Sequence, residues 1–347
     1  MKPNKESNPV KPTTFLKSEF NKKDNEERKP DTGYIGGVST VLGYTRTKMD
    51  GEITLKDSLR WKEGLELFLF GMFGGNRVGV PSTETGETGL YVYNFGDGSN
   101  LPYWTVLQGI NMGLTGDELL PSIRDNAIIS SFKLSLADDG NITCEIGFMN
   151  DYPLYNIVPT EPTRTYAPTS YIVSKANVKI GVGDIGTLES ALILTDCITS
   201  LEADFKYKAE SKSCYADTFG TNNLSRGNLE STVKYSMALN QNNMRLEEKF
   251  STGKVGGVRP TEKVFKQKIV IFIDGYEVTT GKKTSAKIVL PEIALKPPER
   301  STSGDGDATL EVEADTTMDI ITGQMVNIRV ASELPQIPQS AGTYTVP

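Results

Sequence analysis

The sequence contains no histidine among its 347 residues. This absence removes the commonest general base and the commonest metal ligand, and it excludes the Ser-His-Asp and Cys-His systems of nucleophilic catalysis. We therefore expect a protein that is not an enzyme and that holds no cofactor and no metal.

Cysteine is scarce, and long apolar runs are missing. Cys144, Cys197 and Cys214 are odd in number and form no Cys-x-x-Cys motif, which favours buried reduced thiols and predicts no disulfide. No segment approaches the roughly 18 apolar residues that a membrane helix requires, and the start MKPNKESNPVKP lacks the apolar centre of a signal peptide. We expect a soluble chain that is made in a cytoplasm and does not insert into a membrane.

Basic charge is in deficit, with 37 Lys and Arg against 44 Asp and Glu and a net charge of −7. Residues 1–33 hold eight of the basic and six of the acidic residues, so the rest of the chain is the more acidic part. A surface that neutralises phosphates needs an excess of Lys and Arg. Specific binding of DNA is therefore not expected.

Composition divides the chain into five parts. Residues 1–33 have too few large apolar side chains to offset the entropy of ordering and are predicted to be a flexible N-terminal arm. Residues 152–171 contain four prolines and predict a linker, and residues 331–347 predict a Pro-rich tail. Two β domains are expected between these segments, over 34–151 and 172–330.

Period-two alternation dominates both expected domains and predicts strands. The segments are ISSFKLSL at 129–136, NITCEIGF at 141–148, LEADFKYK at 201–208, LESTVKYSMAL at 229–239, KIVIFI at 268–273, SAKIVL at 285–290 and ATLEVEA at 308–314. Asp-Gly pairs at 50–51, 97–98, 139–140 and 274–275 predict tight turns.

Two segments show helical periodicity. The stronger is 61–73, which is apolar nearly all round, so that a second surface is expected to cover the side that the core leaves open. On this basis the candidates for a subunit interface are Trp61, Leu65, Leu67, Phe68, Phe70 and Phe73, and Phe70→Asp is expected to give soluble protein that no longer polymerises. The weaker helix is 240–250, which Gly253 is placed to end.

Three further motifs have a functional and a structural interpretation. GVGDIG at 181–186 has the form of a dinucleotide fingerprint, but its strand-rich surroundings favour turn glycines. Asp138, Asp139, Asp305 and Asp307 are interpreted as turn formers, because calcium loops need a full ligand series. The pair Tyr103 and Trp104 suits packing on a sheet or contact with carbohydrate.

The two halves share one order of elements, which indicates an internal repeat. Residues 51–75 correspond to 230–253, and residues 130–149 correspond to 291–314.

Several segments between about residues 34 and 320 follow one another in an order that is typical of a known family. These segments are GEITLKDSLRWKEGLELFLFGMFGG, LPYWTVLQG, AIISSFKLSLADDGNITCEIGF, SKANVKIGV, CITSLEADFKYK and RGNLESTVKYSMAL. In their order the chain resembles the major tail tube proteins of long-tailed, siphovirus-like bacteriophages.

The resemblance implies a mainly β chain of two tandem tail-tube-type β-sandwich or barrel domains, each with one flanking α-helix, plus extended N- and C-terminal arms. It implies a structural virion protein, assembled in the host cytoplasm, whose stacked rings form the conduit for DNA ejection. A trimer would be a pseudo-hexamer of about 24 strands, and a hexamer of chains is the competing stoichiometry.

The partners implied are further copies of the chain and other tail proteins such as the tape measure and the terminator, while DNA passes through without specific binding. Two other interpretations stay open. One is a different β-sandwich virion component, such as a tail decoration, baseplate or adhesion module, that binds a host-surface glycan or a neighbouring tail protein. The other is a nucleotide-dependent enzyme built on GVGDIG.

Overall fold

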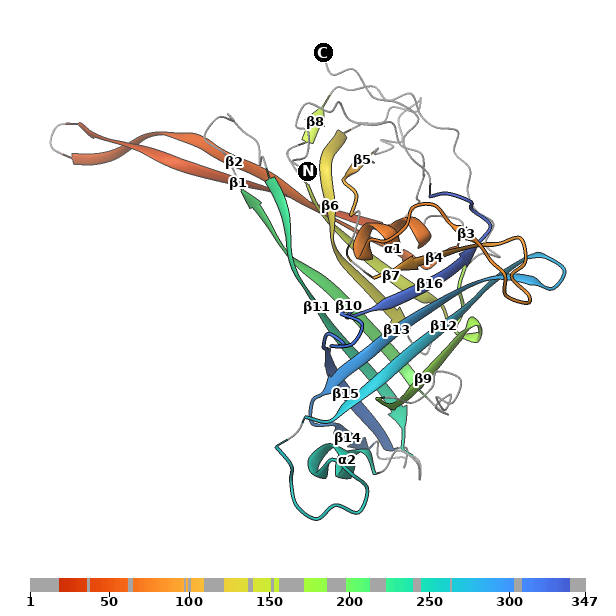
Figure 1. Cartoon of the computed structure of the whole chain (residues 1–347). Coiled ribbons are helices and arrows are strands. Elements are labelled where there is room, and N and C mark those ends of the chain that lie inside the picture. Colours follow the sequence, from red (N-terminus) through yellow and green to blue (C-terminus); the bar gives the residue numbers. More distant parts are fainter. Residues whose placement is uncertain are drawn as a thin grey trace.

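The structure is a computed structural model. It describes residues 19–35, 38–61, 65–96, 98, 101–108, 122–136, 140–150, 153–155, 172–185, 198–212, 223–239, 245–262, 264–302 and 308–337. The described part is mainly β, as the sequence predicts, with a large antiparallel sheet and two α-helices (Figure 1).

The elements alternate between hairpins and single helices. The first half contains β1 (Glu19–Ile35), β2 (Val38–Ser58), α1 (Leu65–Phe73), β3 (Val80–Pro81), β4 (Tyr91–Phe95), β5 (Trp104–Gln108), β6 (Ser122–Leu136), β7 (Ile142–Asn150) and β8 (Pro153–Tyr155). The second half contains β9 (Val178–Asp184), β10 (Ile198–Lys212), β11 (Asn223–Ala238), α2 (Leu246–Thr252), β12 (Lys266–Thr279), β13 (Lys282–Leu295), β14 (Glu299–Thr302), β15 (Ala308–Thr316) and β16 (Asn327–Ser332).

The sheet folds over at β15 into a β-sandwich-like body. The first layer has the strand order β1-β2-β7-β6-β10-β11-β15-β14. β15 also pairs with β13, which belongs to the second layer. In that layer β13 pairs on one side with β12, which pairs with β9, and on the other side with β16, which is followed by β4 and β3. Alternate residues of both layers enter one hydrophobic cluster, which includes Phe132 and Phe205 from the first layer and Ile271 and Ile288 from the second. The strands therefore form because period-two apolar residues are buried on one face.

Strand pairing links the two halves of the chain. β6 pairs with β10, and β4 pairs with β16, so that Phe95 lies opposite Ile328. The predicted domains share a sheet and a hydrophobic cluster in the described residues, and the predicted boundary at residue 330 falls inside β16. The linker predicted at 152–171 lies almost wholly outside the described residues.

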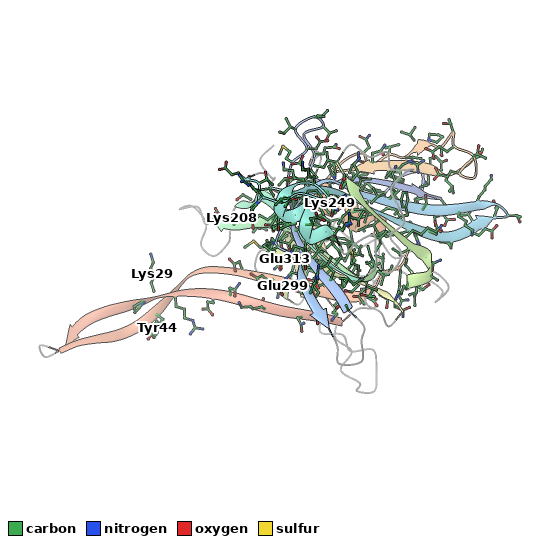
Figure 2. The ribbon with its side chains drawn as sticks, turned by 90° about the horizontal axis from the view of Figure 1, so that it is seen from below. Lys29, Tyr44, Lys208, Lys249, Glu299 and Glu313 are labelled. Atoms are coloured by element: carbon green, nitrogen blue, oxygen red, sulfur yellow. The ribbon has the colours of Figure 1, made fainter. Side chains whose placement is uncertain are left out.

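Part of the predicted arm is a strand. β1 pairs with β2 from Glu19 opposite Lys56 to Ile35 opposite Val38, and the hairpin projects far beyond the body, as Figures 1 and 2 show. Backbone hydrogen bonds order this segment without a hydrophobic face, which composition alone did not reveal. Residues 1–18 of the predicted arm are outside the described part.

Two of the predicted Asp-Gly turns are wrong, because these pairs lie inside strands. Gly51 is within β2 and Gly275 is within β12. A Cβ at Gly51 would meet the side chain of Arg124, and a Cβ at Gly275 would meet Thr284 and the Trp61 ring. These glycines permit a close approach of neighbouring side chains, which is another common role of glycine in a strand.

The first two glycines of GVGDIG lie in a strand and not in the expected turn. Gly181 and Gly183 belong to β9, where they pair with Val270 and Lys268 of the antiparallel neighbour β12. A dinucleotide fingerprint instead follows a strand of a parallel sheet. Gly186, the last residue of the motif, lies outside the described residues.

Both predicted helices are present, and residues 62–64 and 240–244 of the predicted ranges lie outside the described part. α1 begins at Leu65, and α2 covers Leu246–Thr252. Gly253 adopts the left-handed conformation with φ of 77°, and its N–H donates to Lys249 O at 2.8 Å, which ends α2 as the sequence predicts.

Candidate assembly surface

The first layer presents a polar face opposite its buried face. Rows of directly opposed residues cross the strands, such as Lys56, Glu145, Lys133 and Asp204 on β2, β7, β6 and β10. Within the described residues, this register gives the face more carboxylates than ammonium groups. The carboxylates include Asp50, Glu52, Glu145, Glu202, Asp204, Glu210, Glu230, Glu299, Glu311, Glu313 and Asp315, of which Asp50 alone is buried, and the ammonium groups include Lys23, Lys56, Lys133, Lys206, Lys208 and Lys234.

Ion pairs join neighbouring strands across this face. Lys133 of β6 lies 3.0 Å from Glu202 of β10, and the hydrogen bond raises the pKa of Lys133. Glu313 of β15 accepts from Lys296 and lies 3.0 Å from Lys234, and these two cations lower its pKa. The face is therefore charged and accessible to solvent, with an excess of negative charge.

The two halves build this layer with the same connectivity. In the first half the hairpin β1–β2 precedes α1, and the hairpin β6–β7 then adds through β7 to β2. In the second half the hairpin β10–β11 precedes α2, and the hairpin β14–β15 adds through β15 to β11. Both first hairpins extend toward the same side of the body in Figure 1. This order matches the repeat that the sequence indicates.

The layer has an edge strand at each end. Within the described ranges, β1 pairs with β2 alone and β14 pairs with β15 alone. An edge strand presents backbone N–H and C=O groups on one side, which favours pairing with another chain. Pro297 and Pro298 directly precede β14, and proline is typical of an edge position because it donates no backbone hydrogen bond.

The residues predicted for the subunit interface lie mostly inside the chain. Trp61, Leu65, Phe68, Phe70 and Phe73 are buried, and Leu67 is half-buried. The surplus apolar side of α1 is covered by aromatic rings of the same chain, because Phe70 packs on Phe95 at 6.3 Å and Phe68 packs on Trp104 at 6.5 Å between ring centroids. Their burial gives no support to a contact with a second copy.

Helix α1 also buries one carboxyl group that the periodicity does not explain. Ser332 of β16 donates to Glu66 Oε1 at 2.6 Å, and burial raises the pKa of Glu66. Glu66 therefore attaches α1 to the second half of the chain.

The remaining predicted residues have structural surroundings or lie outside the described part. Trp104 packs edge-on against Phe148 with ring centroids 6.2 Å apart, whereas Tyr103 is exposed, so the two rings do not form one exposed pair. Cys144 is a buried thiol whose pKa is raised to about 12 by burial. The turn aspartates 138, 139, 305 and 307 and the other two cysteines are not described.

The described part contains no candidate cation site and no candidate membrane helix. Its His, Cys, Asp and Glu residues form no group of three or more that could hold a metal ion. Its helices are also too short or too polar to cross a membrane.

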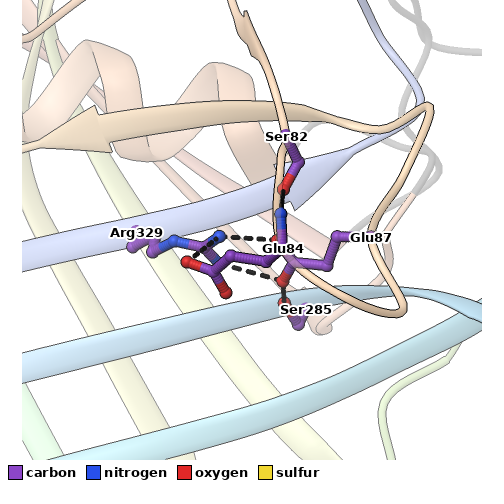
Figure 3. Close-up of polar contacts among 5 residues, drawn as sticks. All are labelled: Ser82, Glu84, Glu87, Ser285 and Arg329. Carbon is purple, nitrogen blue, oxygen red and sulfur yellow. Dashed lines mark hydrogen bonds and ion pairs between the residues drawn. The ribbon is translucent and has the colours of Figure 1, made fainter.

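A partly buried ion pair joins the two halves at the loop between β3 and β4. Arg329 of β16 donates to Glu87 through Nη1 at 2.9 Å and through Nη2 at 2.5 Å (Figure 3). Ser82 and Ser285 donate to the same carboxylate at 2.9 and 3.1 Å, and Glu84 lies 3.0 Å from Arg329. Sequence spacing gave no signal for this network, because residues from β13, β16 and a distant loop form it.

We expect this network to make stability depend on acid pH. The hydrogen bond from Arg329 lowers the pKa of Glu87, so the folded state binds fewer protons there than the unfolded state. The free energy of unfolding should therefore fall as the pH drops below about 5 and through the folded-state pKa. Arg329→Gln should lower it by about 2 kcal/mol at pH 7 and reduce this slope.

Urea unfolding at a series of pH values measures both effects. Lys179→Gln is a matched control, since Lys179 lies 3.5 Å from Asp274 on the exposed surface and an exposed pair contributes at most about 1 kcal/mol. An unchanged acid slope in Arg329→Gln would show that Glu87 does not carry the effect.

No protein-family model matches the sequence, and no curated protein matches it at a significant level.

Proposed function

We propose that this chain is a structural virion protein that polymerises into stacked rings, which form a phage tail tube and conduct DNA. The observation that carries the proposal is the eight-stranded layer. It consists of two four-stranded units with the same connectivity, and it has an edge strand at each end. Three copies joined edge to edge would close about 24 strands into a cylinder, wider than barrels of 16 to 18 strands that already enclose water.

The charge of the polar face supports a conduit. Carboxylates outnumber ammonium groups among the described residues of this face, and the ion pairs Lys133–Glu202 and Lys234–Glu313 neutralise part of its positive charge. DNA carries about one negative charge per 1.7 Å, so a basic lining would retain it. A face with excess carboxylate, turned inward, lets the duplex pass without binding.

The projecting hairpin β1–β2 supports stacking of rings. Its outer part, with Lys29 and Tyr44, lies away from the body in Figure 2, and the Tyr44 side chain is 67% exposed. A long exposed hairpin is marginal alone in water, because two strands bury little surface. A neighbouring ring would cover it.

Negative-stain microscopy and sedimentation of the purified chain test the proposal. We expect hollow cylinders at high protein concentration, and we expect them not to retain duplex DNA when the two are sedimented together. A chain that stays single or forms small closed oligomers at all concentrations would contradict the proposal. Small oligomers that bind a glycan would instead favour an adhesion or decoration component.

A further inference from the structure

The pairing of β6 with β10, which joins the two halves of the chain, indicates how the edge strands of two copies could pair. β6 and β10 pair over six positions, from Ser131 opposite Lys206 to Leu136 opposite Leu201. On the buried face Phe132 opposes Phe205, and on the polar face opposite charges meet. This junction joins the end of one repeat to the start of the next.

Two equivalent hydrogen bonds align the repeats residue by residue. The N–H of Leu59, which follows β2, donates to Ile142 O at 2.7 Å, and the N–H of Leu239, which follows β11, donates to Ala308 O at 2.8 Å. Each bond joins the end of one long strand to the start of β7 or β15. Leu59 therefore corresponds to Leu239, and Ile142 corresponds to Ala308.

This alignment matches β1 with β10. Glu52 of β2 corresponds to Thr232 of β11, and their partners are Lys23 on β1 and Asp204 on β10. Lys23 therefore occupies in the first repeat the place of Asp204 in the second.

The same alignment matches β14 with β6. Glu145 of β7 corresponds to Glu311 of β15, and their partners are Lys133 on β6 and Glu299 on β14. Glu299 therefore occupies the place of Lys133.

We propose that β14 of one copy pairs antiparallel with the start of β1 of a second copy, in the register that joins β6 to β10, so that Glu299 lies opposite Lys23. This inference rests on the proposed function, because a closed ring supplies the second copy. Lys133 opposes Asp204 within the chain, and Glu299 opposes Lys23 between chains, so both junctions place opposite charges face to face. Lys23 and Glu299 are both exposed in the single chain.

The proposed register also places two cations opposite each other on the other face of the sheet, and each has a carboxylate nearby. Lys22 lies 3.1 Å from Asp24, and Arg300 lies 2.6 Å from Glu247. These carboxylates offset the repulsion between Lys22 and Arg300. The pairing covers Phe20 to Lys23 and Glu299 to Thr302, because Pro298 beyond β14 has no N–H to donate.

Cysteine cross-linking between two single variants tests the pairing. Directly opposed residues of antiparallel strands have Cβ atoms about 4.5–5.5 Å apart, close to the separation that a disulfide spans. Mixed Lys23→Cys and Glu299→Cys chains, assembled and mildly oxidised, should give a covalent dimer. The yield should exceed by about tenfold that of Lys29→Cys mixed with Glu299→Cys, since Lys29 lies on the projecting part of β1.

Charge reversal gives an independent readout. Lys23→Glu and Glu299→Lys should each raise the protein concentration needed for assembly by about threefold, and the double variant should restore it. Wild-type protein oxidised in parallel accounts for the natural cysteines.

Microscopy of every sample separates the inference from the proposed function. Cylinders that form without the covalent dimer would overturn the strand pairing and leave the tube function standing. A covalent dimer without cylinders would support the pairing and contradict the tube. The absence of both would overturn both.

Discussion

Replacement of Phe70 by aspartate is expected to prevent stable folding of the chain. Phe70 is 5% exposed and packs against Phe95 inside the body, so the variant would bury an unpaired charge and lose the contacts of the ring. Loss of a buried Phe side chain alone costs about 3–5 kcal/mol, which is a large share of the stability of an ordinary domain. Soluble yield and thermal unfolding followed by circular dichroism measure the effect.

Phe70→Leu is the matched control for this experiment. It keeps an apolar side chain at the same position of α1 and should cost less than about 2 kcal/mol. A soluble Phe70→Asp variant with an unchanged unfolding temperature and no assembly would restore the interface that periodicity suggests.

The second large effect is expected at the base of the projecting hairpin. Arg124 of β6 is 0% exposed, and its Nη2 donates to Asp24 Oδ1 of β1 at 2.6 Å. Asp24→Asn would leave the guanidinium buried without a compensating charge, at a cost of about 3–5 kcal/mol. Arg124→Met replaces the buried cation with an apolar side chain of similar length. It should lower the free energy of unfolding by much less, because the attraction within a buried ion pair is largely cancelled by the cost of removing its charges from water.

Urea unfolding of Asp24→Asn, Arg124→Met and the double variant separates these contributions. The double variant should have nearly the stability of Arg124→Met, because Asp24 would then neutralise only Lys22, and a partly exposed ion pair contributes at most about 1 kcal/mol. If the Asp24→Asn variant is as stable as the Arg124→Met variant, the buried guanidinium does not need this carboxylate for neutralisation.

Local patterns predicted much of the secondary structure. Alternation identified β6, β7, β10, β11 and β15 of the first layer but not β1 or β14, and the spacing of apolar residues found α1 and, with Gly253, the end of α2. These features depend on interactions between residues close in sequence, which periodicity reports directly.

Interactions between distant residues were harder to predict. Gly51 and Gly275 have the sequence of hairpin turns, yet Arg124 and Trp61 lie over them inside strands. The aromatic partner of Phe70 is on β4, which composition does not connect with α1. The apolar residues on both sides of α1 are buried within the single chain, and whether a second copy also contacts this helix stays a prediction.

The candidate assembly surface was predictable only in outline. The sequence indicated a repeat and an acidic body, but it gave no register, and a shift of one residue would move every charged side chain to the opposite face. Only the pairing of β6 with β10 identifies which residues oppose each other.

The pairing of β4 with β16 also bears on synthesis. Phe95 is made early, and its partner Ile328 leaves the ribosome only after most of the second half has been translated. Contacts of such wide sequence separation form late and slowly. A nascent chain thus keeps the covering layer of its first half incomplete, and a copy cut short before β16 would lack the strand that joins β4 to β13. Incomplete chains therefore cannot close the layer that covers the first half.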